Sequence, residues 1–160
     1  MAYTTIAKPS DQFDTPTWEG SNSTTTITGM GFQPDSIWIK RHDGNGHGYI
    51  NNSTQGTGHN WKTSAGSHAD DTTVMVASYT SDGFTLTGNI NATNDASQNY
   101  LASCWKANGG TTSSNTNGSI TSTVQANTTA GFSIVTWTGS GANATIGHGL
   151  STAPKVVLVK

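Results

Sequence analysis

The sequence is poor in charged residues. Asp, Glu, Lys and Arg make up only 10% of its 160 residues, whereas about a quarter is usual in soluble domains. Seven basic side chains against nine acidic ones cannot form the dense basic surface that binding to a phosphate backbone requires. We therefore expect no nucleic-acid partner.

Cysteine pairs, long apolar runs and targeting signals are missing as well. The single cysteine, Cys104, excludes an intrachain disulfide and a zinc site built on cysteines. No run of about 18 apolar residues is present that could cross a membrane. Residues 1–10 contain neither the basic nor the apolar region of a secretory signal. The sequence therefore predicts no membrane partner and no cofactor.

Good helix formers are also scarce, and Thr, Ser, Asn and Gly fill about half of the chain. Aromatic and β-branched residues in such a background are typical of short strands joined by many turns. Strand patterns recur at intervals of about ten residues, which predicts an all-β fold, with a tight hairpin turn at 81–83. The predicted strands are 15–18, 24–28, 36–41, 48–51, 74–79, 83–87, 100–106, 119–124, 132–138, 144–146 and 155–159.

Two of these strands are apolar without interruption, at 37–39 and 156–159. Such runs are typical of strands that are covered on both faces. Large aromatic residues inside strand patterns are most simply core residues. We therefore expect Trp38, Trp18 and Trp105 to lie in the core.

An internal repeat relates the two ends of the chain, with an offset of about 119 residues. Segments 13–20 and 132–139 both begin with Phe, contain Thr-Trp and end in Gly. Segments 34–40 and 154–160 both run from Pro through an apolar stretch to Lys, and Trp18 recurs as Trp137. The repeat predicts three parts: a first β module at 1–108, a polar connector with one strand at 109–130, and the start of a second, incomplete β module at 131–160.

Several segments, which together cover most of the chain, carry a resemblance to a known family. They are 1–6, 31–40, 81–84, 105–107, 115–124, 127–137 and 147–150. These segments resemble the repeat modules of virion proteins from marine bacteriophages, described as tail-fibre or structural proteins. The resemblance implies an antiparallel β-sandwich of the concanavalin or jelly-roll type, which is lectin-like.

The same resemblance implies a function. It points to a non-enzymatic virion structural protein, in a tail fibre, an appendage or a capsid decoration. Such a protein is assembled into the virion in the host cytoplasm, and its partners are other phage virion proteins. The family offers no catalytic residues that could be transferred to this sequence.

The end of the repeat predicts a contact between subunits. Val156, Val157, Leu158 and Val159 would form an apolar edge strand, which is an aggregation hazard unless it is covered. The first module, a continuation of the chain or a neighbouring subunit could cover it. We favour a neighbouring subunit, and hence a homo-oligomer, with a trimer as the first expectation because fibres are often trimeric.

Residues that could support catalysis do not form a recognisable pattern. No Gly-x-Ser-x-Gly elbow marks a nucleophilic serine, and the only glutamate, Glu19, lies in a turn. The glycine-rich loop 42–47 holds two histidines and an aspartate, and its Asp-Gly and Asn-Gly pairs favour a solvated turn over a metal site. His148 is rejected as a ligand because its counterpart in the repeat is Met30. We expect no catalytic residues, and hence no enzyme.

Calcium is the one metal that oxygen ligands could hold here. Lectin-like sandwiches sometimes bind Ca²⁺ through loop aspartates, and Asp70, Asp71, Asp82 and Asp95 are the candidates. The sequence lacks the dense acidic cluster of a dedicated calcium loop. We therefore expect no metal site.

Carbohydrate binding is the alternative function. Trp61 lies in a long loop outside the strand patterns, where it either anchors the loop or stacks on a sugar ring. Together with Tyr49 and the Asn-rich loops, it is a candidate ligand residue of a carbohydrate-binding or adhesin module that attaches to a host-surface glycan. Cys104 is expected to be a small buried apolar residue.

Overall fold

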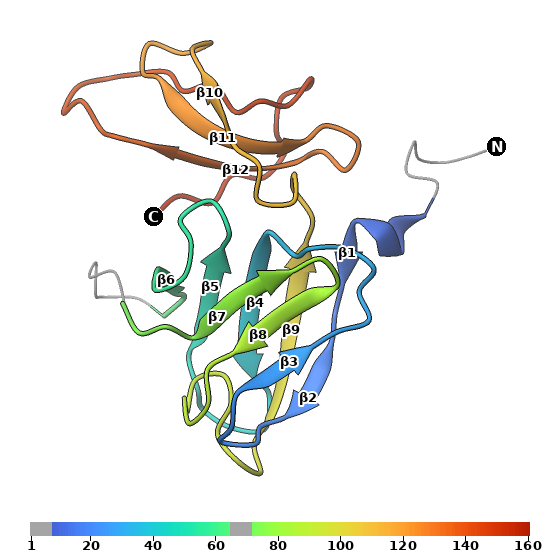
Figure 1. Ribbon diagram of the computed structural model, residues 1–160. Helices are drawn as coiled ribbons and strands as arrows, with labels where there is room; N and C mark the ends of the chain where they lie inside the picture. Colours follow the sequence, from blue (N-terminus) through green and yellow to red (C-terminus); the bar gives the residue numbers. More distant parts are fainter. Residues whose placement is uncertain (1–7, 65–71) are drawn as a thin grey trace.

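The computed structural model describes residues 8–64 and 72–160, and in these residues the fold is all-β, as predicted. Within these residues, twelve strands form three antiparallel sheets, and one 3₁₀ turn, η1, spans Pro9–Asp11 (Figure 1). The strands are β1 Phe13–Asp14, β2 Thr17–Glu19, β3 Thr25–Ile27, β4 Ser36–Arg41, β5 Gly48–Asn52, β6 Asn60–Lys62, β7 Val76–Thr80, β8 Gly83–Leu86, β9 Asn99–Trp105, β10 Ser113–Asn115, β11 Ser122–Asn127 and β12 Phe132–Trp137.

The first nine strands form two sheets, which we call the two-sheet body. Sheet A has the order β1-β9-β4-β5-β6, with β2 also paired to β9, and sheet B has the order β3-β8-β7. The last three strands form sheet C, in the order β10-β11-β12. In Figure 1, sheet B lies in front of β4, β5 and β9, and sheet C lies above the body.

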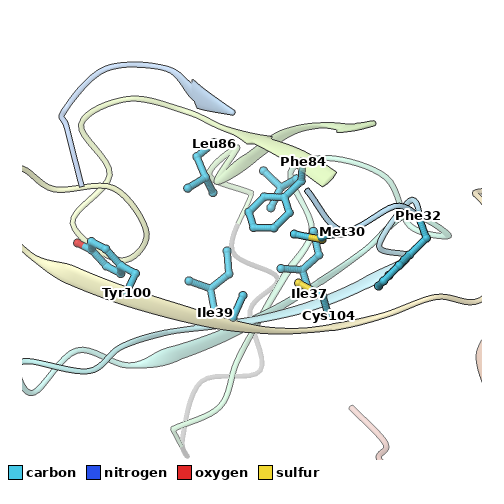
Figure 2. Packing of buried hydrophobic residues seen from close by; sticks show 10 residues of the cluster. Met30, Phe32, Ile37, Ile39, Phe84, Leu86, Tyr100 and Cys104 are labelled. Carbon is cyan, nitrogen blue, oxygen red and sulfur yellow. The ribbon is translucent and has the colours of Figure 1, made fainter. Parts of the chain in front are cut away.

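The hydrophobic core lies between sheets A and B. In the β4–β9 ladder, Ile37 pairs with Cys104 and Ile39 with Ala102, so these four side chains point to one face. Side chains from sheet B and from the loop after β3 close the core from the other side (Figure 2). Each large apolar side chain buried in this way contributes about 1.5–3 kcal/mol. The buried cluster consists of Met30, Phe32, Ile37, Ile39, Val76, Phe84, Leu86, Tyr100, Ala102 and Cys104.

Trp18 packs against this core, as predicted. Its ring stacks on Tyr100 with 5.7 Å between centroids and meets Phe84 edge-on at 5.9 Å. Its Nε1 donates a hydrogen bond of 3.0 Å to the carbonyl oxygen of Thr93. The indole therefore buries an apolar ring and still satisfies its one polar group.

The β7–β8 hairpin has the predicted tight turn, with two residues between Thr80 and Gly83. One of them, Asp82, accepts hydrogen bonds from the backbone N–H of Gly31 at 2.7 Å and of Gly29 at 3.0 Å. These two donors favour the charged carboxylate, so the pKa of Asp82 lies below its ordinary value. The turn thereby holds the loop that leads from sheet B to sheet A.

Sheet C is tied to the body by a buried polar cluster around Asp35. Gln125 of β11 is fully buried beside it, and its Nε2 donates to Ser53 Oγ at 3.0 Å. Every partner of the buried Asp35 side chain is a hydrogen-bond donor, so its oxygens are satisfied without a basic residue. Five groups donate to the Asp35 carboxylate at 2.7–3.0 Å: Ala107 N, Gly109 N, Gly110 N, Gln33 Nε2 and Ser53 Oγ.

Trp105 forms an aromatic contact at the same junction. It pairs with Ser36 in the ladder and so lies on the face of sheet A opposite to the core, not in the core as predicted. Its ring lies 5.2 Å from that of Phe13 and is stacked on that of Phe132 at 6.0 Å, centroid to centroid. Since Phe132 belongs to β12, the stack joins sheet C to the body.

The region after the body differs from the prediction in its strands. Segment 109–130 was expected to hold one strand, but it holds both β10 and β11. Of the predicted strand 144–146, only an isolated bridge between Ile120 and Ile146 is formed. Residues 155–159 do not form a strand, and Val156, Val157, Leu158 and Val159 are 66–76% exposed.

The two copies of the sequence repeat also differ in structure. Trp18 packs on the core, whereas its counterpart Trp137 is 40% exposed. Segment 34–40 contributes the central strand β4, whereas no strand is formed in segment 154–160. The likeness in sequence is therefore not accompanied by a matching set of strands in this chain.

Candidate functional site

The outer face of sheet A, on the side away from the core, carries an exposed tryptophan. Ile37 and Ile39 are fully buried, and the alternation of the strand sends Trp38, which lies between them, to the other face. Trp38 is 40% exposed. The expectation that β4 is covered on both faces is therefore wrong at Trp38.

Strand register aligns Trp38 with a second tryptophan. Trp38 pairs with Ile50 of β5, and Ile50 pairs with Trp61 of β6. The Cα atoms of Trp38 and Trp61 are thus about 10 Å apart, twice the usual strand spacing. On the other side, Ser103 of β9 pairs with Trp38. We call Ser103, Trp38, Ile50 and Trp61 the tryptophan row.

A groove of about 480 Å³ adjoins the row at Trp38. Gly48 forms part of it, and a Cβ atom there would lie 2.9 Å from Trp38 Nε1 and 2.7 Å from Thr63 Oγ1. The indole of Trp38 therefore reaches over the neighbouring strand β5 at Gly48, which has no side chain in its way. The groove is lined by Trp38, Lys40, Gly46, His47, Gly48, Thr63, Ser64, Leu101 and Ser103.

The groove differs in charge from the chain as a whole. Lys40 and His47 contribute its titratable side chains, and none of the described lining residues carries a carboxylate. The full chain, in contrast, has a formal net charge of −2. Lys40 Nζ donates to Gly46 O, which leaves two of its three protons for another acceptor.

A second hollow, of about 470 Å³, lies between sheet C and segment 146–150. Its polar lining includes the amide side chains of Asn108, Asn115 and Asn117, and its apolar lining includes Val124. His148 borders it, and its Nδ1 accepts a hydrogen bond of 3.1 Å from Leu150 N. This hollow has neither an aromatic platform nor a permanent charge, so it is the weaker candidate.

Comparison with known proteins places the chain in a family. A family model described as a domain of unknown function, DUF7483, matches residues 8–160. The chain belongs to the DUF7483 family. No curated protein and no solved structure matches it. The match includes the two-sheet body, sheet C and both hollows, so the DUF7483 unit contains every feature described above.

The candidate ligand residues from the sequence do not form one site in this DUF7483 chain. Trp61 lies in β6, not in a loop, and points to the outer face with Ile50. Tyr49 is 8% exposed and pairs with Lys62, so it lies on the opposite face of the same sheet. On the outer face, Trp61 lies in one row with Trp38 instead.

In the glycine-rich loop 42–47, which contains two histidines, Asp43 has a structural role. Arg41 Nε donates to its carboxylate at 2.8 Å, as do the backbone N–H of Asn99 at 2.8 Å and its Nδ2 at 3.1 Å. The bond from Arg41 contributes most to a pKa of about 2 for Asp43, against an ordinary value of 3.8. His42 donates its backbone N–H to Asn99 O at 3.0 Å. The loop is thus fixed to the start of β9.

The other acidic candidates do not converge. Asp82 accepts hydrogen bonds from the backbone of Gly29 and Gly31. Asp95 accepts one from Asn91 Nδ2 at 3.1 Å. Asp70 and Asp71 lie outside the described residues. In residues 8–64 and 72–160, no group of three His, Cys, Asp or Glu side chains could hold a metal ion. No helix in this part of the chain is long and apolar enough to cross a membrane.

Sequence reasoning missed Trp38 as a surface residue, and with it the groove. The signal was available in the strand period: if Ile37 and Ile39 face the core, Trp38 and Lys40 must face away. The groove residues on β9, Leu101 and Ser103, follow from the same alternation beside buried Ala102. The position of Leu101 and Ser103 beside Lys40 and Trp38 depends on the register between β4 and β9, which the sequence alone did not supply.

Proposed function

We propose that this chain is a non-enzymatic structural module of a bacteriophage particle, in a tail fibre, an appendage or a capsid decoration. The proposal rests on the resemblance of its sequence segments to virion repeat modules. The facing sheets A and B support a lectin-like or jelly-roll sandwich as the finer description of the two-sheet body. The partners would be other virion proteins and further copies of the chain.

The cluster around Asp35 is the structural observation that supports this role. A surface module of a particle has to keep its parts in a fixed arrangement, and here residues that flank the strands of sheet A share buried hydrogen bonds with Gln125 of sheet C. Polar clusters of this kind rigidify a fold when every member has a partner. Low charge and many Thr, Ser and Asn side chains suit a hydrated surface.

Mass spectrometry of purified phage particles, followed by cryo-electron microscopy, tests this proposal. We expect the chain among the particle proteins, at a surface position in the map. Its consistent absence from purified particles, with presence only in infected-cell lysate, would contradict a virion role.

We propose carbohydrate binding by the outer face of sheet A as a second function, compatible with the first. The tryptophan row carries this proposal, because Trp38 and Trp61 present two ring surfaces on one face. Sugar sites combine such rings with a few polar groups that fix orientation, and Ser103, Thr63 and Lys40 lie beside Trp38.

A glycan array tests it with the full chain and three variants. Trp38→Ala and Trp61→Ala are expected to lower binding. Trp137→Ala is the matched control, because Trp137 is also 40% exposed but belongs to sheet C. Equal loss in all three variants, or binding that no variant changes, would remove the support for this face.

A further inference from the structure

We propose that the groove beside Trp38 binds an acidic glycan, whose carboxylate or sulfate group contacts Lys40. This inference rests on the proposed carbohydrate function and adds the chemical class of the ligand. It is carried by the charge of the groove, the position of Lys40 relative to Trp38, and the length of the tryptophan row.

The charge of the groove favours an anion. Lys40 and His47 line it, and no carboxylate is found among the described lining residues. An anionic group that enters the groove would therefore meet a cation, and none of the described lining residues would repel it. In a chain with more acidic than basic residues, this local excess of positive charge is not a consequence of the overall composition.

The position of Lys40 suits a substituent of a stacked sugar. Lys40 and Trp38 lie two residues apart on β4 and point to the same face, so their Cα atoms are about 7 Å apart. Lys40 pairs with Gly48, which adds no side chain of its own to this face. A sugar ring on the indole of Trp38 would thus have its acidic group within reach of the Lys40 ammonium.

The tryptophan row sets the size of the ligand. The Cα atoms of Trp61 and Trp38 lie about two strand spacings, or about 10 Å, apart, which exceeds the width of one sugar ring. An oligosaccharide that runs across β4, β5 and β6 can contact both, over Ile50. The expected ligand is therefore an acidic oligosaccharide or polysaccharide and not an isolated charged sugar.

Calorimetry with matched sugar pairs tests the inference. The first pair is the hexamer of β-1,4-mannuronate and that of β-1,4-mannose, which differ only in the carboxylate. The second is a sulfated carrageenan oligosaccharide and its desulfated form. We expect at least one acidic member to bind about tenfold more tightly than its neutral partner, as a charge-assisted hydrogen bond warrants. The difference should shrink when NaCl is raised.

Two variants assign the effect to the groove. Lys40→Met keeps the aliphatic stem and should reduce the acidic member to the affinity of the neutral one, leaving the neutral one unchanged. Trp38→Ala should weaken both members. Thermal unfolding of each variant confirms that it folds, and Trp137→Ala again serves as the control.

The outcomes separate this inference from the function on which it rests. If acidic and neutral members bind equally and Lys40→Met has no effect, the acidic preference is wrong and carbohydrate binding stands. If no member of either pair binds, both are overturned. If Trp38→Ala instead changes the mass of the chain in solution, the face is a contact between copies, which also overturns the inference.

Discussion

Asp35 and Gln125 accept hydrogen bonds from the same backbone group, the N–H of Gly110, at 2.8 and 2.9 Å. Asp35 directly precedes β4 of sheet A, and Gln125 belongs to β11 of sheet C. The turn after β9 is therefore held from both sides by buried acceptors. A fixed turn at this place gives sheet C one position on the body.

Replacing Asp35 by Ala should destabilise the protein strongly. The variant leaves the buried backbone N–H of Ala107 and the part-buried one of Gly109 without this acceptor, whereas the N–H of Gly110 keeps Gln125. Each unsatisfied buried donor costs about 1–3 kcal/mol, so we expect a loss of about 2 kcal/mol or more in urea unfolding. Asp11→Ala is the control: its ion pair with Lys8 is exposed and should cost less than about 1 kcal/mol. Similar losses in both variants would contradict the role assigned to Asp35.

Cys104 should be inert in the folded protein. Its side chain is fully buried, and burial raises the pKa of the thiol, with a further contribution from the charge of Asp14. Since the thiolate is the reactive form, we expect no labelling by a disulfide reagent at pH 8 until urea unfolds the chain. A Ser103→Cys, Cys104→Ala variant, with the thiol on the outer face, should react at once. Rapid labelling of native Cys104 would show that the core opens easily.

The body was predictable where turn residues bracket apolar strands. Strand 36–41 was predicted with its observed bounds, and the hairpin at 81–83 was placed correctly. Short strands such as β1 and β6 were missed because two or three residues show no period. The Asp35 cluster was not predictable, since its backbone donors are 72–75 residues away in the chain.

Apolar composition alone was a poor guide to strands and to burial. Segment 155–159 is as apolar as β4, yet a strand requires a partner edge with which to exchange hydrogen bonds, and this segment has none among the described residues. Trp38 was assigned to the core for its size, although the parity of its neighbours puts it outside. The candidate site was therefore recovered in part, through Trp61 alone.

Acid should weaken the hold of Asp43 on β9. Folding lowers the pKa of Asp43 from 3.8 to about 2, mainly through the hydrogen bond from Arg41. The folded state thus binds the proton less tightly than the unfolded state, and the stabilisation is complete above about pH 4 and lost as the pH falls towards 2. We expect the difference in melting temperature between wild type and Asp43→Asn to narrow over this range. Parallel melting curves from pH 6 to pH 2 would contradict this assignment.

The exposed segment Val156–Val159 remains the predicted contact between subunits. Four adjacent apolar side chains that are 66–76% exposed form a surface that association would bury at about 25 cal/mol per Å². We expect light scattering to show an oligomer for the full chain and a monomer after deletion of residues 155–160. Val74→Asp is the control, because Val74 is exposed elsewhere. A monomeric full chain, or a truncated chain that assembles as before, would refute the contact.

Gly48 should control the position of Trp38. A Cβ atom at this residue would lie 2.9 Å from Trp38 Nε1, closer than real Cβ contacts, so Gly48→Ala must displace the indole. We expect a shift of the Trp38 indole N–H signal in NMR spectra, assigned with Trp38→Phe, and weaker glycan binding. Overpacking of this kind costs about 1–3 kcal/mol, so the chain should stay folded. Gly139→Ala, where a Cβ would meet nothing within 4 Å, should leave both signal and affinity unchanged. An unshifted Trp38 signal in Gly48→Ala would show that the ring is not held across Gly48 in solution.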